Sequence, residues 1–286
     1  MFPELFRIGD FVVTSFGLMM FLSFIAGAWA TGRQLERYNL ERELIWDMLA
    51  GIAIGGILGA KIYYLLLHLD DVAANPAGEI FSRGGLVWYG GLIGGVLAYY
   101  WQIKRRGLPV APMFDATAPA LFLAIAVGRM GCFLVGDDYG RPTDGWYGVA
   151  FPEGAPASTA GYFRSIGVEV PAGLPDNAVL AVHPTQLYEI ALVLPLFALL
   201  WHLGRRAMAP GRLFALFLGL YGVERFLIEF VRAKDDRILL GLSTSQGVSV
   251  LLVIAAIVIW YRQANVLPFR AKPAPAAKGK GAAARG

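Results

Sequence analysis

Two arginines stand inside long apolar stretches of this chain of 286 residues. Arg129 lies in AVGRMGCFLVGDDYG and Arg225 lies in LYGVERFLIEFVR. A guanidinium near the middle of a bilayer costs about 2.5–3.5 kcal/mol on insertion scales, so it must face a polar cavity, a partner or an anionic ligand. The pair therefore predicts a site that binds phosphate or carboxylate inside the bilayer.

Polar residues recur around Arg225 at helical spacing. Tyr221, Arg225, Glu229 and Arg232 follow one another at intervals of four, four and three, and we predict that they line one face of one helix. An Arg225–Glu229 ion pair that only joins helices is one interpretation, and a functional anion site is the other. The adjacent Glu224 lies about 100° around the helix, and we expect it to pair with a base on another segment, such as Lys61.

A glycine-rich segment follows Arg129. Its three glycines and two acids are Gly131, Gly136, Asp137, Asp138 and Gly140. Glycine permits a tight non-helical turn, and backbone N–H groups freed by such a turn beside an arginine form a concavity suited to phosphate. A loop that merely ends a helix is the alternative. Further along, HPTQLYE at residues 183–189 places Pro184 where a helix begins and Glu189 within its first turns.

Composition sets the framework for these residues. Hydrophobic residues make up 57% of the chain and charged residues only 16%, and the apolar residues form successive blocks long enough to span a bilayer. The single cysteine, Cys132, excludes an intramolecular disulfide. The basic residues form no stripe with interleaved aromatics, which argues against nucleic-acid binding. We find no metal-ligand cluster and no phosphate-binding loop motif, so we expect no cofactor.

We predict an all-α polytopic membrane protein with about seven transmembrane helices and a small extracytoplasmic cap between the fourth and fifth. The seven expected spans are 11–31, 46–68, 86–102, 112–131, 184–203, 213–231 and 245–262. The first has no basic segment before it and no cleavage site after it, so we expect it to be retained. Glycines four residues apart in the second and third predict close helix packing, and GGLVWYGG at 84–91 is a candidate for irregular backbone beside a cavity.

Basic residues indicate the orientation of the spans. Most of the lysines and arginines lie in the loops after the first, third and fifth spans and in the C-terminal segment, which predicts an outward N-terminus and a cytoplasmic C-terminus. The long loop 132–182 then lies outside, where we expect it to form the folded cap. We assign 1–265 to one transmembrane domain that includes this cap, and 266–286 to a disordered basic cytoplasmic tail.

Taken together, these motifs resemble one family, the prolipoprotein diacylglyceryl transferases, over about residues 10–265. The matching segments are SFGLM at 15–19, GGLVWYGGLIGG at 84–95, the glycine-rich segment at 129–143, HPTQLYE at 183–189 and YGVERFLIEFVR at 221–232. Such enzymes act in the bacterial inner membrane, in the first step of lipoprotein maturation.

The resemblance implies a reaction and its partners. The diacylglyceryl group of phosphatidylglycerol, a membrane lipid, would move to the lipobox cysteine of a prolipoprotein signal peptide, releasing glycerol 1-phosphate without a metal or nucleotide. Arg129 and Arg225 match the family's essential arginines, which would hold the lipid phosphate and stabilise the leaving group. The other catalytic candidates are Tyr89, Asp137 and Glu229. The remaining substrate-binding candidates are Gly140, His183, Gln186, Tyr188, Glu189, Tyr221 and Arg232.

The chain departs from the family pattern at several positions. Tyr89 replaces a histidine that is a candidate general base, Cys132 and Val135 replace asparagines, and Phe16 replaces a tyrosine. A tyrosine with a reference pKa of about 10 is a poorer base at neutral pH. Deprotonation of the acceptor thiol would then fall to Asp137, Glu229 or water, with Tyr89 orienting the substrate.

Two other functions are compatible with the same residues. The chain could be a diverged relative that uses another acceptor, with the Cys132 thiol as a nucleophile. It could also be a non-enzymatic protein that binds or translocates anionic lipid through an Arg129–Arg225 cavity. Transporters commonly contain internal repeats, and the sequence shows no convincing repeat.

Overall fold

The computed structural model describes residues 3–9, 11–82, 85–233, 237–239, 242–263 and 265–267. The chain divides into two compact units, which are described separately. One unit comprises Met1–Thr31 with Phe114–Val266, and the second comprises Gly32–Met113 with Leu267–Gly286. The predicted tail lies outside the described residues except at 266 and 267.

The first unit begins with a short antiparallel hairpin. Strands β1 (Glu4–Ile8) and β2 (Phe11–Thr14) pair with Arg7 opposite Val12, and helix α1 (Ser15–Leu35) follows directly. The expectation of a span from residue 11 is therefore wrong over 11–14. That segment reads FVVT, and its two valines and threonine favour a strand once a partner strand is available.

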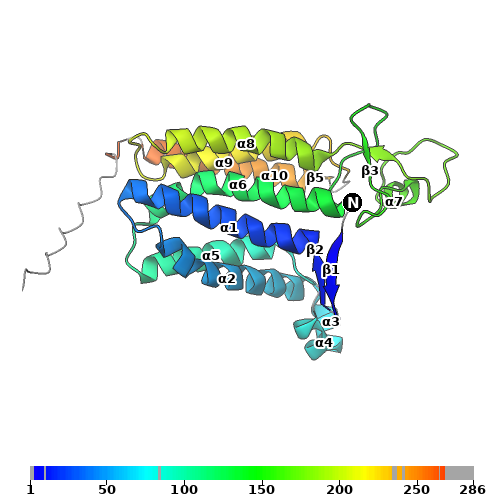
Figure 1. Ribbon diagram of the computed structural model, residues 1–286, viewed down its shortest axis with the longest axis horizontal. Coiled ribbons are helices and arrows are strands. Elements are labelled where there is room, and N and C mark those ends of the chain that lie inside the picture. Colours follow the sequence, from blue (N-terminus) through cyan, green and yellow to red (C-terminus); the bar gives the residue numbers. More distant parts are fainter. Residues whose placement is uncertain are drawn as a thin grey trace, which may run out of the picture. The chain divides into compact units, whose positions relative to one another are not determined.

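Four more long helices carry the rest of this unit. They are α6 (Val110–Val135), α8 (Thr185–Leu203), α9 (Arg212–Ile228) and α10 (Thr244–Arg262). Figure 1 shows α6, α8, α9 and α10 running alongside one another. Their apolar core joins α6, α8 and α9 through Phe122, Val193, Leu200, Leu213 and Phe217.

A buried acid on α6 fixes the start of α9. Gly211 precedes α9 and has no side chain to cap it, but the Asp115 carboxylate accepts hydrogen bonds from the backbone N–H groups of Gly211 at 2.6 Å and Phe214 at 2.8 Å. A carboxylate at a helix N-terminus satisfies donors that have no partner within the helix and complements the helix dipole. This contact sets how α9, the helix that contains Arg225, lies along α6.

Helix α6 continues further than predicted. Gly131 and Cys132 are helical, and the turn comes later, where Gly136 and Asp138 adopt positive φ angles of 75° and 56°. Gly131 instead allows a close approach to α1, because a Cβ atom there would lie 2.9 Å from Met19 Cβ. The loop therefore begins at residue 136, four residues after the predicted 132.

The segment between α6 and α8, residues 136–184, is folded. It contains strands β3 (Val149–Ala150) and β4 (Ala181–Val182), which pair in antiparallel fashion, and helix α7 (Ala160–Ser165). Figure 1 places β3 and α7 at one end of the helices of this unit. Phe151, Phe163 and Val182 are wholly buried there. A second short hairpin, β5 (Arg237–Leu239) with β6 (Leu242–Ser243), precedes α10.

The second unit is built on one helix pair. Helices α2 (Leu44–Leu67) and α5 (Trp88–Arg105) pack together, with short helices η1 (Glu36–Tyr38), α3 (Leu69–Ala74) and α4 (Pro76–Phe81) beside them in sequence. A Cβ atom on Gly59 would lie 2.8 Å from Gly94 Cα, so the predicted close packing of glycines is confirmed.

Five helical segments are long and apolar enough to cross a membrane, among the residues that the structure describes. They are Ser15–Tyr38, Leu44–Leu67, Val110–Val135, Thr185–Leu203 and Thr244–Arg262. The other two predicted spans form helices of 18 and 17 residues, α5 and α9, which do not meet the same standard. The protein is mostly helical and polytopic, and its described residues also form three two-stranded sheets, which the predicted all-α fold did not include.

Candidate functional site

Six charged side chains of the first unit form a closed ring in which arginines and carboxylates alternate. We call it the charge ring; its members, in order of contact, are Arg225, Glu189, Arg129, Asp138, Arg232 and Glu229. They come from α6, the loop after it, α8, α9 and the turn after α9. The ring has three positive and three negative groups, so it is neutral when all six are ionised.

Glu189 is the most buried member and joins two arginines. Its carboxylate accepts a hydrogen bond from Arg129 Nε at 2.6 Å and another from Arg225 Nη1 at 3.2 Å. The Glu189 side chain is only 2% exposed, against 17% for Arg129 and 12% for Arg225. Both predicted arginines are therefore brought together, and a predicted substrate-binding residue is the group that holds them.

Asp138 joins the same Arg129 to Arg232. One carboxylate oxygen accepts from Arg129 Nη1 at 2.9 Å and the other from Arg232 Nη2 at 2.6 Å. Asp138 is the most exposed ring member, at 35%, and was given no role in the sequence analysis. The signal that points to it is the pair of acids, Asp137 and Asp138, that follows the glycine after an apolar helix containing an arginine.

Glu229 closes the ring with longer contacts. Its Oε2 atom lies 3.6 Å from Arg225 Nη2 and 3.9 Å from Arg232 Nε. Both of its oxygens are buried without a hydrogen-bond partner among the described residues. The Arg225–Glu229 pair that would only join helices is present, but the contacts of Arg225 and Arg129 with Glu189 are shorter.

Arg232 does not lie on the predicted helix face. Helix α9 ends at Ile228, and Arg232 forms an isolated antiparallel bridge with Gly140. Gly140 N–H donates to the His183 carbonyl at 2.8 Å. A Cβ atom on Gly140 would lie 2.5 Å from the Val231 carbonyl oxygen, so only glycine fits between these strands of backbone.

Asp137 and Cys132 lie beside the ring. Arg129 Nη1 donates to Cys132 Sγ at 3.7 Å, and the Cys132 thiol also interacts with the Asp137 carboxyl. Oδ1 of Asp137 is buried and has no hydrogen-bond partner among the described residues. Burial raises the pKa of the Asp137 carboxyl above its ordinary value. Gln186 Nε2 donates to the Asp137 carbonyl oxygen, which links α8 to this turn.

The other predicted residues occupy different places. Tyr221 lies on α9, stacks on Phe217 and interacts electrostatically with Arg225 and Arg129. His183 and Tyr188 contact each other, with 3.3 Å between Nδ1 and the hydroxyl oxygen. Burial lowers the pKa of His183.

Tyr89 belongs to the second unit, where it lies in the first turn of α5 and packs edge-on against Trp88. Its predicted role in the site stays a prediction. Lys61 belongs to the second unit, where it donates to Ser82 Oγ at 2.8 Å, and its expected pairing with Glu224 stays a prediction. Both Glu224 oxygens are buried without a hydrogen-bond partner in the described part of the chain.

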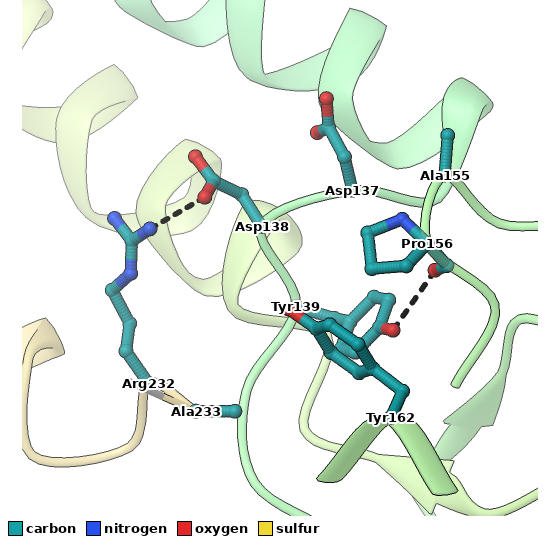
Figure 2. Close-up of a pocket in the computed structure, with 8 residues that line it drawn as sticks. All are labelled: Asp137, Asp138, Tyr139, Ala155, Pro156, Tyr162, Arg232 and Ala233. Atoms are coloured by element: carbon teal, nitrogen blue, oxygen red, sulfur yellow. Dashed lines mark hydrogen bonds and ion pairs between the residues drawn. The ribbon is translucent and has the colours of Figure 1, made fainter. Parts of the chain in front are cut away.

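A polar cavity of about 240 Å³ opens beside the ring. Figure 2 shows the Asp138–Arg232 pair on one side of it and the hydrogen bond from the Tyr139 hydroxyl to the Pro156 carbonyl, 2.9 Å long, on the other. Within the described ranges, no group of three or more His, Cys, Asp or Glu side chains is arranged to hold a metal ion.

Comparisons with known proteins point to one family. Residues 3–262 match the family model described as prolipoprotein diacylglyceryl transferase. A protein of Clostridium tetani named phosphatidylglycerol–prolipoprotein diacylglyceryl transferase is 33% identical over 261 residues, which cover 90% of this chain and 96% of that protein. Proteins with the same name from Geobacter sulfurreducens, 35% identical over 82% of this chain and 84% of their own length, and Neisseria gonorrhoeae, 33% identical over 91% and 95%, are also similar.

The geometry predicts that Glu189 is required for stability. Glu189→Ala leaves two buried guanidiniums without their shared carboxylate, and breaking a buried pair in this way costs about 3–5 kcal/mol. Thermal unfolding of the purified protein in detergent measures the effect. Glu4→Ala is the matched control, because Glu4 pairs with Arg7 and both side chains are more than half exposed, so its loss should cost less than about 1 kcal/mol. Equal Tm values for Glu189→Ala and the wild type would contradict the assignment.

Proposed function

We infer from its membership of the prolipoprotein diacylglyceryl transferase family that this chain is a phosphatidylglycerol–prolipoprotein diacylglyceryl transferase. The family model covers nearly the whole chain, and the relatives of that name align along most of their own length. The substrates in that name, phosphatidylglycerol and a prolipoprotein, are therefore those assigned to this chain.

We propose that the acceptor is the thiol of a lipobox cysteine in the signal peptide. The thiolate sulfur forms a bond to the terminal glyceryl carbon of the diacylglyceryl group. The bond between that carbon and the phosphate oxygen breaks, and its electron pair leaves with glycerol 1-phosphate. The thiol proton passes to a base in the site. The site must therefore bind a phosphodiester, stabilise the charge on the departing phosphate and accept one proton.

The charge ring is the observation that carries this proposal. Two arginines from different helices are held by one buried carboxylate, so both guanidiniums are fixed next to the same point. Each guanidinium has five N–H donors, and the contacts with Glu189 use one on each. Nη1 of Arg129 also donates to Asp138 and Cys132. The donors that these contacts leave would bind a phosphate at the edge of the ring and stabilise the negative charge that grows on the leaving group.

Asp137 is our proposed acceptor of the thiol proton. Its carboxyl lies next to the ring, has one buried oxygen without a hydrogen-bond partner among the described residues, and has a pKa raised by burial. A raised pKa makes a carboxylate a stronger base and brings it nearer to the thiol in proton affinity. Glu229 stays within the ring as a partner of two arginines, and Tyr89 is proposed to orient the substrate.

We further propose seven spans, with α5 and α9 crossing the bilayer in addition to the five longer segments. The distribution of basic residues supports an outward N-terminus, an outward cap and a cytoplasmic tail at 266–286. The cap then comprises the folded segment 136–182, and the charge ring lies beneath it. The compartment proposed is the bacterial inner membrane.

The arginines provide the first test. Arg129→Ala and Arg225→Ala should each lower kcat/KM by about 10²–10³-fold or more, since each removes donors aimed at a developing charge. Arg225→Lys should also be poor, because lysine lacks the planar fork. The assay follows the mass of a lipobox peptide incubated with phosphatidylglycerol and purified protein. Arg164→Ala is the control, since Arg164 pairs with Asp176 and is 39% exposed. Full turnover in either arginine-to-alanine variant of the ring would refute the phosphate-binding role.

The proton acceptor has its own signature in pH dependence. The reaction needs Asp137 deprotonated, so kcat/KM should fall as the pH drops through the Asp137 pKa, and the raised pKa places this fall above the ordinary value of about 4. Asp137→Asn should lose about 10²–10⁴-fold in rate, whereas Asp137→Glu keeps the carboxylate and should retain turnover. Asp144→Asn, an exposed acid of the same segment, serves as control. If kcat/KM of Asp137→Asn still fell at low pH as it does in the wild type, the group that accepts the thiol proton would not be Asp137.

A covalent role for Cys132 is the second candidate mechanism, because its thiol lies 3.7 Å from Arg129 Nη1. We propose instead that Cys132 only packs against the arginine and Asp137. Cys132→Ala should then keep transfer to a lipobox peptide within about threefold, since the loss is one weak sulfur hydrogen bond. Loss of all transfer in a folded Cys132→Ala protein, with a lipid adduct on the wild-type cysteine, would establish the covalent mechanism.

A further inference from the structure

The cavity beside the charge ring is large enough for a small polar group. It is lined by Asp137, Asp138, Tyr139, Ala155, Pro156, Tyr162, Arg232 and Ala233. Its volume of about 240 Å³ lies below the roughly 300–1,000 Å³ of pockets that hold drug-sized molecules. Three chain segments meet around it: the turn after α6, the cap and the turn after α9 (Figure 2).

One wall of the cavity offers a hydroxyl that is held in place. Tyr162 lies on α7. Its ring packs against the rings of Tyr139 and Phe163, and the ring centroids are 6.1 and 5.6 Å apart. Figure 2 shows the Tyr162 side chain reaching across the cavity toward the side where Asp138 and Arg232 lie, and it interacts electrostatically with both. Its hydroxyl makes no hydrogen bond to the described residues, whereas the Tyr139 hydroxyl already donates to Pro156.

The charges around the cavity select the class of ligand. Two carboxylates, Asp137 and Asp138, disfavour a second phosphate, and an ammonium group has no acceptor for the donors of Arg232 and Tyr162. Acceptors and donors face the same space, and this mixture suits hydroxyl groups, each of which can donate to a carboxylate and accept from tyrosine or arginine. A neutral diol can form hydrogen bonds with both the acceptors and the donors that line the cavity.

We propose that this cavity binds the glyceryl diol of the phosphatidylglycerol headgroup and selects that headgroup over others. The proposal rests on the proposed function, since it concerns the same substrate. Asp138 lies in the cavity wall and also accepts a hydrogen bond from Arg129. A phosphate bound to Arg129 would therefore lie next to Asp138, with its headgroup beside the cavity. The headgroup glycerol is attached directly to that phosphate, and its two free hydroxyls would lie against Asp138 and Tyr162 in the cavity wall.

Headgroup analogues test this inference. The purified full-length protein is given phosphatidylglycerol, phosphatidylpropanol, which lacks both free hydroxyls, or phosphatidylethanolamine, each with the same lipobox peptide. Since one hydrogen bond is worth about 2- to 10-fold, kcat/KM for phosphatidylglycerol should exceed that for phosphatidylpropanol at least about fivefold. Free glycerol 1-phosphate should likewise inhibit more strongly than methyl phosphate, which separates recognition of the diol from attachment to lipid.

The Tyr162→Phe variant tests whether the preference for phosphatidylglycerol over phosphatidylpropanol arises in the cavity. It should lower kcat/KM for phosphatidylglycerol about 2- to 10-fold and change the value for phosphatidylpropanol less than twofold, because only the first lipid has a hydroxyl to lose its partner. A merely structural role of the tyrosine would move both lipids equally. Tyr147→Phe, in the same cap but outside the cavity lining, is the matched control and should move neither.

The outcomes separate the two proposals. Failure of the wild-type protein to transfer from any of the lipids would overturn the proposed function itself. Transfer at equal rates from phosphatidylglycerol and phosphatidylpropanol, or an equal fall for both lipids in Tyr162→Phe, would overturn the diol site while leaving the transferase in place. A preference for phosphatidylethanolamine would overturn it in favour of a cation-binding cavity.

Discussion

The buried carboxylate of Glu189, shared by Arg129 and Arg225, is the interaction on which the rest of the site depends. Two guanidiniums and one carboxylate are held among apolar helices, where an unpaired charge costs several kcal/mol. The contact is possible only if α6, α8 and α9 are closely packed and in one register. The capping of α9 by Asp115 and the tight fit of Gly140 both serve that register. The ion pairs therefore form only when the helices are packed, and packing the helices buries charges that must be paired.

The same arrangement accounts for how the proposed site would bind an anion among apolar helices. Arginines that are already oriented by Glu189, Asp138 and Glu229 need no reorganisation when a phosphate arrives, and preorganised donors are the largest source of catalysis in many enzymes. The ring is neutral without substrate. In the proposed reaction the phosphate adds negative charge, and the charge that develops on the leaving group lies beside donors that are already in place.

The sequence allowed prediction of the helices and of the charged residues, because apolar blocks and arginines within them have few physical solutions. Arg129, Arg225 and Glu189 were each identified from their local motif. The contact between them was not, since pairing across three helices depends on helix register. The end of α9 was missed because spacing alone places Arg232 on the helix face, whereas its backbone pairs with Gly140.

The most direct test of the account is to incubate the purified protein with phosphatidylglycerol and a lipobox peptide, and to measure the peptide mass together with the released glycerol phosphate. The account predicts a diacylglyceryl mass gain that depends on the peptide cysteine, with one glycerol 1-phosphate released for each modified peptide. Lipid binding without either product, under conditions in which a related transferase is active, would contradict it.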